Sequence, residues 1–335
     1  MMSDAVLLLG GGGFIGTVLA CHLAAMGRQV HVVTRRPASA DFISPPCSQP
    51  RLAAPHGGGV GLGRPSADFS SIQFHAGNLQ DRALLARLLP VCGTVIHLAS
   101  ETTPGVSARC PTLEAGNLLP TLGLLEMLQE FPAIHLIYLS SGGTLYGSPD
   151  KLPVAEDAPL SPQSYHGAGK AAQEMFLQAF RAQGCAVTTL RPANAYGPGQ
   201  SLRTGFGLVR TVLECIRHDL PLEIWGNGEA VRDYVYVDDV AAACALFVAR
   251  PDDNGTYNVG SGEGCSINEL IRRAGKVCGR MPRVEYRPAR TGDVARVVLD
   301  ITRLRAAGWV PKVSLDAGLQ QTWAWLQDKS DCLRV

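Results

Sequence analysis

The chain has 335 residues, of which 46% are hydrophobic, and a formal net charge of +1 at pH 7. This length allows a large buried core and two domains. The near-neutral charge argues against nucleic acid or an anionic membrane surface as a partner, and no apolar run reaches membrane-spanning length. The ten cysteines form no C-x-x-C pair. We therefore expect reduced thiols, no metal site and a cytoplasmic location.

A glycine-rich turn follows the first apolar segment. Residues 6–9 predict a buried strand, and the apolar positions that follow Gly16 predict an amphipathic helix. Between them, Gly10, Gly13 and Gly16 have the G-x-x-G-x-x-G spacing. In this context, backbone N–H groups at the helix N-terminus can hold a pyrophosphate. The sequence therefore favours a dinucleotide site over an ordinary structural turn.

The end of the second predicted strand, at residues 29–33, bears on the choice of cofactor. A carboxylate after this strand would hold the ribose 2′-hydroxyl of NAD. Here the chain continues Thr34-Arg35-Arg36 without a carboxylate. Because guanidinium groups suit a 2′-phosphate, NADP is favoured over NAD. Two alternatives stay open: arginine also stacks on adenine, and the pair could form a solvated basic turn.

Strands and helices alternate through the first half of the chain. Strands are predicted at residues 72–75, 94–99 and 135–139, and helices at 82–89 and 118–128. This order predicts an α/β fold with a doubly wound parallel sheet of the Rossmann type. Such sheets bind ligands at the carboxyl ends of their strands.

Further motifs follow in a fixed order. They are SSGGTLYG at 140–147, PQSYHGAGK at 162–170, RPANAYGP at 191–198, RDYVYVDDV at 232–240, YNVGSG at 257–262 and RTGD at 290–293. With the glycine turn, they resemble the extended short-chain dehydrogenase/reductase family, especially its nucleotide-sugar epimerases and dehydratases. The resemblance covers residues 6–326, which is nearly the whole chain.

This resemblance implies a division into two domains. Residues 1–190 would form the dinucleotide-binding domain, to which residues 229–260 would return. Residues 191–228 and 261–335 would form a smaller C-terminal substrate domain. The segment 37–71 is rich in proline and glycine without periodicity, so we expect a flexible loop there.

The resemblance also implies a reaction. A nicotinamide cofactor would transiently oxidise a nucleotide sugar in a homodimeric enzyme, and the favoured outcome is epimerisation at C4 of a UDP-hexose. An NADP(H)-dependent reductase and a 4,6-dehydratase are alternatives, although Gly142-Gly143 replace the Asp-Glu pair common in dehydratases. An alternative of another class is a non-catalytic protein that binds nucleotide sugars.

The family's cofactor contacts map onto residues at the predicted strand ends and the first helix. They are Gly10, Gly13, Phe14, Ile15, Gly16, Thr34, Arg35, Arg36, Asn78, Leu79, Leu98, Ala99, Ser100, Asn117, Lys170 and Pro192.

The catalytic positions depart from the family pattern. A tyrosine usually precedes the lysine by four residues, but here His166 precedes Lys170, and Tyr165 lies one residue too early. Three alternatives stay open for His166. It could act as the catalytic base in place of tyrosine, it could show that the site has lost activity, or it could be a histidine that only packs in the core. Where the family usually has the catalytic hydroxyl, this chain has Gly142, so Ser141 or Thr144 would take that role.

The diphosphate of the substrate would be held near four residues of the later motifs. They are Asn194, Arg232, Arg290 and Asp293. Arginine forks suit phosphate oxygens. Asp238 and Asp239 resemble an acid/base pair, but we expect them to cap the helix at residues 240–248.

Overall fold

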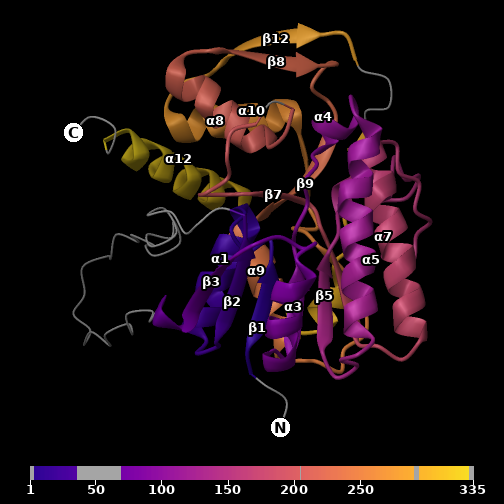
Figure 1. The fold of residues 1–335 in the computed structure, drawn as a ribbon. Helices are drawn as coiled ribbons and strands as arrows, with labels where there is room; N and C mark the ends of the chain where they lie inside the picture. Colours follow the sequence, from indigo (N-terminus) through magenta and orange to yellow (C-terminus); the bar gives the residue numbers. More distant parts are fainter. Residues whose placement is uncertain (1–3, 36–68, 204, 290–293, 332–335) are drawn as a thin grey trace.

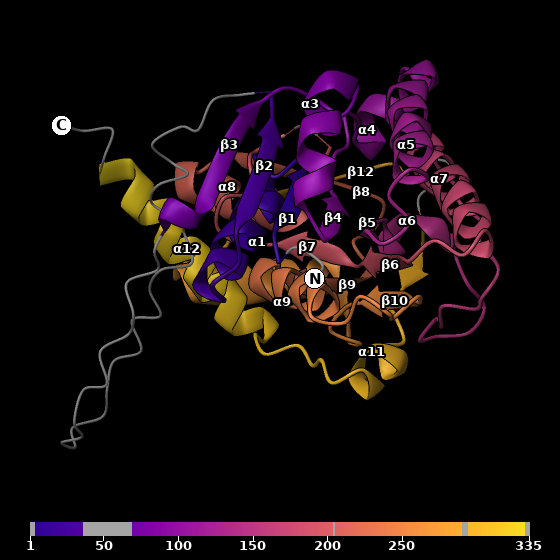
Figure 2. The same cartoon turned by 60° about the horizontal axis from the view of Figure 1, so that its bottom comes forward.

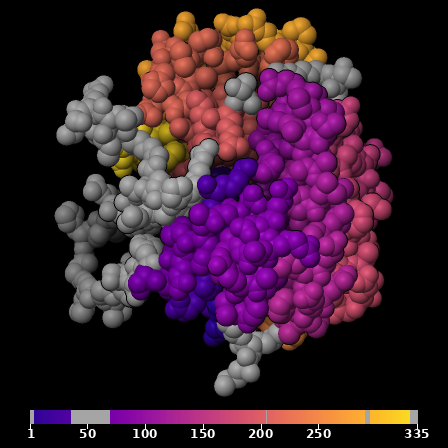
Figure 3. Space-filling view, in the orientation of Figure 1, coloured from indigo at the N-terminus to yellow at the C-terminus, as the bar shows by residue number. Residues whose placement is uncertain are grey.

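The computed structural model describes residues 4–35, 69–203, 205–289 and 294–331. Figure 1 shows a larger part that carries a wide sheet and a smaller part above it. On the surface in Figure 3, the orange smaller part covers the end of the indigo-to-magenta larger part. Each part is built around strands of its own.

Seven strands form the sheet of the larger part. They are β1 (Val6–Leu9), β2 (Val30–Thr34), β3 (Ile72–Ala76), β4 (Thr94–His97), β5 (His135–Leu139), β6 (Val187–Pro192) and β10 (Thr256–Val259). Every neighbouring pair is parallel, and the order is β10-β6-β5-β4-β1-β2-β3. The direction of winding reverses between β1 and β4. Such a reversal leaves room for a ligand beyond the carboxyl ends of these strands.

Helices cover both faces of this sheet. They are α1 (Phe14–Ala25), α3 (Arg82–Leu88), α5 (Ala115–Leu128), α7 (Tyr165–Ala182), α9 (Val237–Val248) and α11 (Thr302–Ala306). Along β1, Val6 and Leu8 pack in one core with α1 and α9, whereas Leu7 and Leu9 pack in another with α3, α5 and α7. Since successive side chains of a strand point to opposite faces, a sheet covered on both faces needs continuous apolar runs. The predicted doubly wound α/β fold is confirmed, and Figure 2 shows α9 on the opposite side of the sheet from α3.

The smaller part contains two further sheets. Four strands form the first: β7 (Asn194–Tyr196), β9 (Val231–Tyr236), β11 (Gly264–Ser266) and β13 (Arg296–Val297). Two parallel strands form the second: β8 (Pro221–Trp225) and β12 (Arg283–Arg287). Three helices complete it: α8 (Leu208–His218), α10 (Ile267–Cys278) and α12 (Leu315–Asp331). Apolar residues of these helices and strands share one core.

Short helical turns occupy several connections. They are η1 (Phe69–Ser71), η2 (Leu89–Val91), α4 (Pro104–Ser107), η3 (Pro111–Glu114) and α6 (Gly142–Leu145). Of the predicted loop 37–71, residues 37–68 lie outside the described residues, and its last three residues form η1 rather than a loop.

The segment 229–260 divides between the two parts. Helix α9 packs on α1, and β10 pairs with β6 in the larger sheet. Strand β9 instead lies in the smaller sheet, where it pairs with β7, β11 and β13. The domain boundaries themselves stay a prediction.

The predicted cap of α9 is wrong. The helix begins at Val237, so Asp238 and Asp239 lie in its first turn, and no side chain caps it. The carboxylate of Asp239 accepts hydrogen bonds from the backbone N–H groups of Lys312 and Val313, both at 3.0 Å. Asp239 therefore ties a distant segment to the helix.

Candidate active site

The glycine turn between β1 and α1 is packed too tightly for side chains. A Cβ atom on Gly10, whose φ is +84°, would lie 2.7 Å from the Cα atom of Ala99. A Cβ atom on Gly16 would lie 2.6 Å from the Cα atom of Gly11. Gly13 is the N-cap residue of α1 and provides no side-chain hydrogen bond. The first N–H groups of the helix therefore have no side-chain cap to compete with an anion.

Most predicted cofactor residues lie along one edge of the sheet. In the register, Leu9 is opposite both Val33 and His97, so the carboxyl ends of β1, β2 and β4 are level. The predicted residues at or after these ends and those of β3 and β6 are Thr34, Asn78, Leu79, Leu98, Ala99, Ser100 and Pro192. The structure thus brings these residues to the edge where the glycine turn lies.

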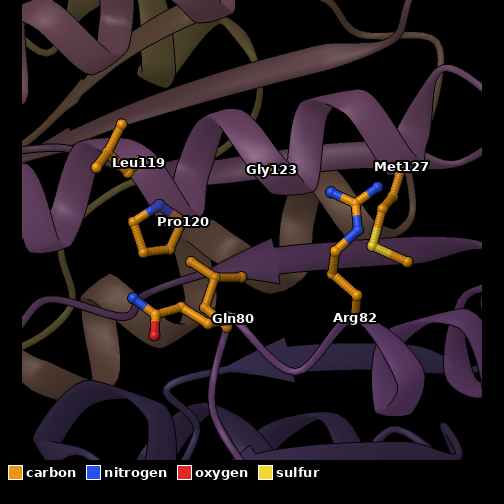
Figure 4. Close-up of a pocket in the computed structure, with 7 residues that line it drawn as sticks. Gln80, Arg82, Leu119, Pro120, Gly123 and Met127 are labelled. Carbon is orange, nitrogen blue, oxygen red and sulfur yellow. The ribbon is translucent and has the colours of Figure 1, made fainter.

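A shallow groove beside this edge is lined by Leu79. Figure 4 shows the groove between the segment that precedes α3 and helix α5, with Gln80 and Pro120 on its two sides. Asn78 makes a tight turn there, since its Oδ1 atom accepts a hydrogen bond from the N–H of Gln80 at 2.8 Å. The contact across to α5 is made by Arg82, which pairs with Glu126 at 3.0 Å.

The basic pair after β2 is only partly described. Arg36 lies outside the described residues. A guanidinium nitrogen of Arg35 lies 2.8 Å from a carboxylate oxygen of Glu101, and both side chains are more than half exposed. An exposed ion pair of this kind is weak, so Arg35 can exchange Glu101 for another anion.

Helix α7 brings His166 and Lys170 to the same edge. Ser164 caps the helix by accepting a hydrogen bond from the N–H of Gly167 at 3.1 Å. The His166 residue is 8% exposed, whereas Tyr165 is 55% exposed. One residue turns a helix by about 100°, so a buried His166 directs Tyr165 outward.

The imidazole of His166 has two polar neighbours. Its Nδ1 atom lies 3.2 Å from the hydroxyl oxygen of Thr102 and 3.5 Å from a carboxylate oxygen of Glu114. Burial and the charge of Lys170 lower the pKa of His166, although Glu114 opposes this effect. The ring is therefore neutral at pH 7 and able to accept a proton.

Lys170 is buried one helical turn after His166. Its ammonium group donates to the backbone oxygen of Leu139 at 3.0 Å and to the hydroxyl of Tyr138 at 3.2 Å. Burial lowers the pKa of Lys170 to about 8, while Glu174 and Glu114 act in the opposite direction. These contacts fix the ammonium group at the carboxyl end of β5.

The two candidate hydroxyls lie together at α6. Thr144 donates a hydrogen bond to the hydroxyl oxygen of Ser141 at 2.9 Å. Gly142, between them, has no room for a side chain, since its Cβ would lie 2.6 Å from Leu299 and 2.8 Å from the backbone oxygen of Arg191. Helix α7 packs on α6, where a Cβ atom on Gly167 would lie 2.5 Å from the backbone oxygen of Thr144.

The predicted diphosphate residues are only partly brought together. Asn194 and Arg232 lie on the adjacent strands β7 and β9, but Arg290 and Asp293 lie outside the described residues. The amide of Asn194 donates to the backbone oxygen of Asp233 at 3.0 Å. A guanidinium nitrogen of Arg232 donates to the backbone oxygen of Val231 at 2.9 Å.

Comparison with known proteins identifies the family. Residues 6–260 match the family described as the NAD dependent epimerase/dehydratase family. The chain belongs to this family. The match covers the glycine turn, both catalytic candidates on α7 and strand β10, so the predicted family resemblance is confirmed.

Relatives of this epimerase/dehydratase chain include a UDP-glucose 4-epimerase of Mycolicibacterium smegmatis, 34% identical over 74% of this chain and 79% of that protein. A solved structure of the UDP-glucose 4-epimerase of Thermotoga maritima with UDP-glucose is 31% identical. It has a TM-score of 0.83 over 97% of this chain and 99% of that one. The UDP-glucose 4-epimerase of Thermus thermophilus in complex with NAD is 31% identical, with a TM-score of 0.82 over 96% and 99% of the two chains.

The described residues fit the nicotinamide dinucleotide on which this family depends. Gly10 and Gly16 let the turn pack closely against Ala99 and Gly11, and no side chain caps the N-terminus of α1, where a pyrophosphate would bind. Lys170 stands at the end of β5, where the family's lysine would meet the nicotinamide ribose. Within the described part of the chain, no cluster of three or more potential metal ligands occurs, and no helix could cross a membrane.

Two neighbours of His166 could not be recognised as site residues from the sequence. Thr102 and Glu114 lie outside every motif of the family pattern, and each is far from His166 along the chain. Glu174, by contrast, is in a buried bidentate pair with Arg191 at 2.6 Å. Folding alone brings Thr102 and Glu114 to the imidazole.

Proposed function

We propose that this epimerase/dehydratase family member is a nucleotide-sugar 4-epimerase in which His166 is the proton acceptor. One observation carries the proposal: His166 is buried one helical turn before Lys170, on the helix that packs against α6, where Ser141 and Thr144 lie. Relatives with the same fold are named as UDP-glucose 4-epimerases, which supports a UDP-hexose as the substrate.

The residues of the site then have separate roles. A nicotinamide cofactor, when bound, supplies the acceptor for the hydride of the sugar C4–H bond. The imidazole of His166 takes the proton of the 4-hydroxyl as that oxygen becomes a carbonyl oxygen, and returns it when the hydride comes back to the opposite face of C4. Ser141 or Thr144 orients the hydroxyl by a hydrogen bond. Lys170 holds the nicotinamide ribose.

The phosphate-binding residues would hold the other end of the substrate. Asn194, Arg232, Arg290 and Asp293 would contact the diphosphate. If the diphosphate stays bound while the oxidised sugar ring rotates, either face of C4 can be presented to the same hydride donor.

Because residue 166 is histidine and not the family's tyrosine, a second candidate function remains: a protein that binds nucleotide sugars without turnover. Incubation with UDP-sugars separates the two: epimer formation supports the 4-epimerase, whereas tight binding of UDP-sugar without product supports the binding protein. Net consumption or formation of reduced cofactor would indicate a reductase, and loss of water a dehydratase.

We also propose that the chain prefers the 2′-phosphorylated cofactor, NADP. The support is the position of Arg35 at the end of β2, in an exposed ion pair with Glu101 that a phosphate can displace. Arg35→Ala should weaken NADP binding about tenfold and NAD binding little, as measured by isothermal titration. Arg109→Ala, at an exposed position away from β2, is the control. Equal losses for the two cofactors, or tighter NAD binding by the unaltered protein, would contradict the preference.

A homodimer in the cytoplasm completes the proposal. Helices α5 and α7 pack side by side at one edge of the molecule (Figure 1). They carry the exposed apolar side chains of Leu119, Met175 and Phe176, which a second copy could cover.

A further inference from the structure

Glu114 is the charged group nearest to Nδ1 of His166. It ends η3, immediately before α5, and its side chain is 12% exposed. The hydroxyl of Ser107 donates to one carboxylate oxygen, and the amide of Asn117 donates to the other at 3.0 Å. Burial raises the pKa of Glu114, but hydrogen bonds from Ser107, Asn117 and Thr102 outweigh it and leave the pKa below its usual value. Glu114 is therefore an ionised carboxylate at neutral pH.

Hydrogen bonds around Asn117 fix where the protons lie. The Oδ1 atom of Asn117 accepts from the backbone N–H of Glu101 at 2.8 Å, so its Nδ2 atom must be the donor to Thr102, also at 2.8 Å. The carboxylate of Glu114, 3.5 Å from Nδ1 of His166, has no proton to donate. This acceptor favours the tautomer of His166 that carries its proton on Nδ1.

This arrangement leaves the other ring nitrogen for chemistry. With the proton on Nδ1, the Nε2 atom of neutral His166 carries the lone pair. Nε2 has no hydrogen-bond partner among the described residues, whereas Nδ1 has Thr102 and Glu114. A proton acceptor in the site must use this free lone pair.

A glycine on α7 makes space for the carboxylate. A Cβ atom on Gly169 would lie 2.5 Å from Oε2 of Glu114. Any other residue at this position would push Glu114 away from α7. The contact between Glu114 and His166 therefore depends on Gly169 as well as on the network around Asn117.

We propose that Glu114 is a positioning residue for His166, which holds its proton on Nδ1 and stabilises the positive charge that forms when Nε2 accepts a proton. The role of Nε2 as the acceptor rests on the proposed function. The proton comes from the sugar 4-hydroxyl, whose oxygen keeps the O–H electron pair to form the carbonyl. The hydride of the C4–H bond leaves at the same time to the nicotinamide that the proposed function requires, so the electrons balance.

The charges around His166 have opposing effects. Lys170, on the same helix, disfavours an imidazolium, as does burial. Glu114, from η3, favours it, and Thr102 is neutral. Without Glu114, burial and Lys170 would lower the pKa of His166 unopposed.

The first test measures the protonation of His166 without any substrate. NMR titration of the histidine ring signals, assigned with His166→Phe, gives the pKa in the unaltered protein and in Glu114→Gln. We expect Glu114→Gln to reduce the proton affinity of His166 about tenfold, which is one pKa unit. Gly169→Ala, which displaces the carboxylate, should act in the same direction and gives a second route if Glu114→Gln does not fold. Glu126→Gln, on the exposed side of α5, is the control and should leave the pKa unchanged.

The second test measures turnover of a UDP-sugar. Glu114→Gln should lower kcat about tenfold with little change in KM, and move the acid limb of the pH profile to lower pH. Glu114→Asp should restore part of kcat. An unchanged pKa of His166 in both variants would overturn the inference, whatever the activity. A shifted pKa with no turnover of any nucleotide sugar would instead overturn the proposed function.

Discussion

The imidazole of His166 lies between a cation and an anion, and this setting decides which base the site favours. Lys170 follows one helical turn later, and Glu114 faces Nδ1 at 3.5 Å. From the sequence alone, which shows only Lys170, a tyrosine at residue 166 would be the better base, because the lysine charge stabilises a phenolate and opposes an imidazolium. Glu114 acts against this expectation, since a carboxylate stabilises an imidazolium and opposes a phenolate.

We therefore expect His166→Tyr to be slower than the unaltered protein. The loss in kcat should be about 10²-fold, within the usual range for a general base, and His166→Phe should be at least as slow. Initial rates with a UDP-sugar check this order. The double variant His166→Tyr with Glu114→Gln should recover part of the loss, because it removes the charge that opposes the phenolate. A single tyrosine variant faster than the unaltered protein would show that Glu114 does not act on the base.

The second departure from the family pattern is Gly142, which stands where a catalytic hydroxyl is usual. Its Cβ would lie 2.6 Å from Leu299 and 2.8 Å from the backbone oxygen of Arg191. Gly142→Ser should therefore lower the free energy of unfolding by about 1–3 kcal/mol through overpacking, rather than restore a catalytic hydroxyl. Urea unfolding measures the change. Gly143→Ala is the matched control, since the nearest atom to its Cβ would be 3.6 Å away. A stable and faster Gly142→Ser variant would contradict this expectation.

At the scale of elements, α9 is joined to a distant segment by one carboxylate. Asp239 accepts two backbone hydrogen bonds, from Lys312 and Val313, and this segment leads directly into α12. The indole N–H of Trp309 also donates to the backbone oxygen of Asp239 at 3.0 Å. These hydrogen bonds hold the segment before α12 against the first turn of α9.

Removal of this carboxylate should loosen the segment before α12. Asp239→Ala leaves two partly buried N–H groups without their acceptor, and we expect it to lower the free energy of unfolding by about 1–3 kcal/mol. Asp252→Ala, at an exposed position, should change it by less than about 0.5 kcal/mol. Urea unfolding compares the two variants, and hydrogen exchange at Lys312 and Val313 should rise only in the first. Equal stability of the variants would mean that water replaces the carboxylate.

At the scale of the whole molecule, the candidate site lies where the two parts meet. The larger sheet provides the glycine turn and the residues of α7, while β7 and β9 of the smaller part provide Asn194 and Arg232. Figures 1 and 3 show the smaller part over the same end of the sheet. A substrate with a nucleotide at one end and a sugar at the other suits a site of this kind, because the two parts can hold different ends.

The exposed side of α5 and α7 allows a test of the proposed homodimer. Met175 is 68% exposed and Phe176 is 46% exposed on α7, and Leu119 is 64% exposed on α5. We expect the unaltered protein to sediment with about twice the mass of one chain, and Met175→Glu with Phe176→Arg to sediment as a single chain. Leu220→Glu, which also replaces an exposed apolar residue but lies in the smaller part, should leave the dimer intact. A monomeric unaltered protein would contradict the proposal.

The sequence by itself determined the local elements and the family. Strand β1, the glycine turn and α1 follow from residues adjacent in the chain, because apolar periodicity and glycine spacing are local properties. The positions of His166 and Lys170 were likewise predictable, since helix geometry fixes their relation over one turn. Their place at the carboxyl edge of the sheet followed from the alternation of strands and helices.

Only the tertiary structure decided what surrounds these residues. Glu114 reaches His166, Gly142 is closed by Leu299, and Asp239 binds the segment at Lys312 because distant elements pack together. The expected cap by Asp239 failed for the same reason: its carboxylate accepts from N–H groups outside its own helix. Local patterns specify which residues face a neighbour, but the identity of that neighbour depends on packing between segments that the sequence separates.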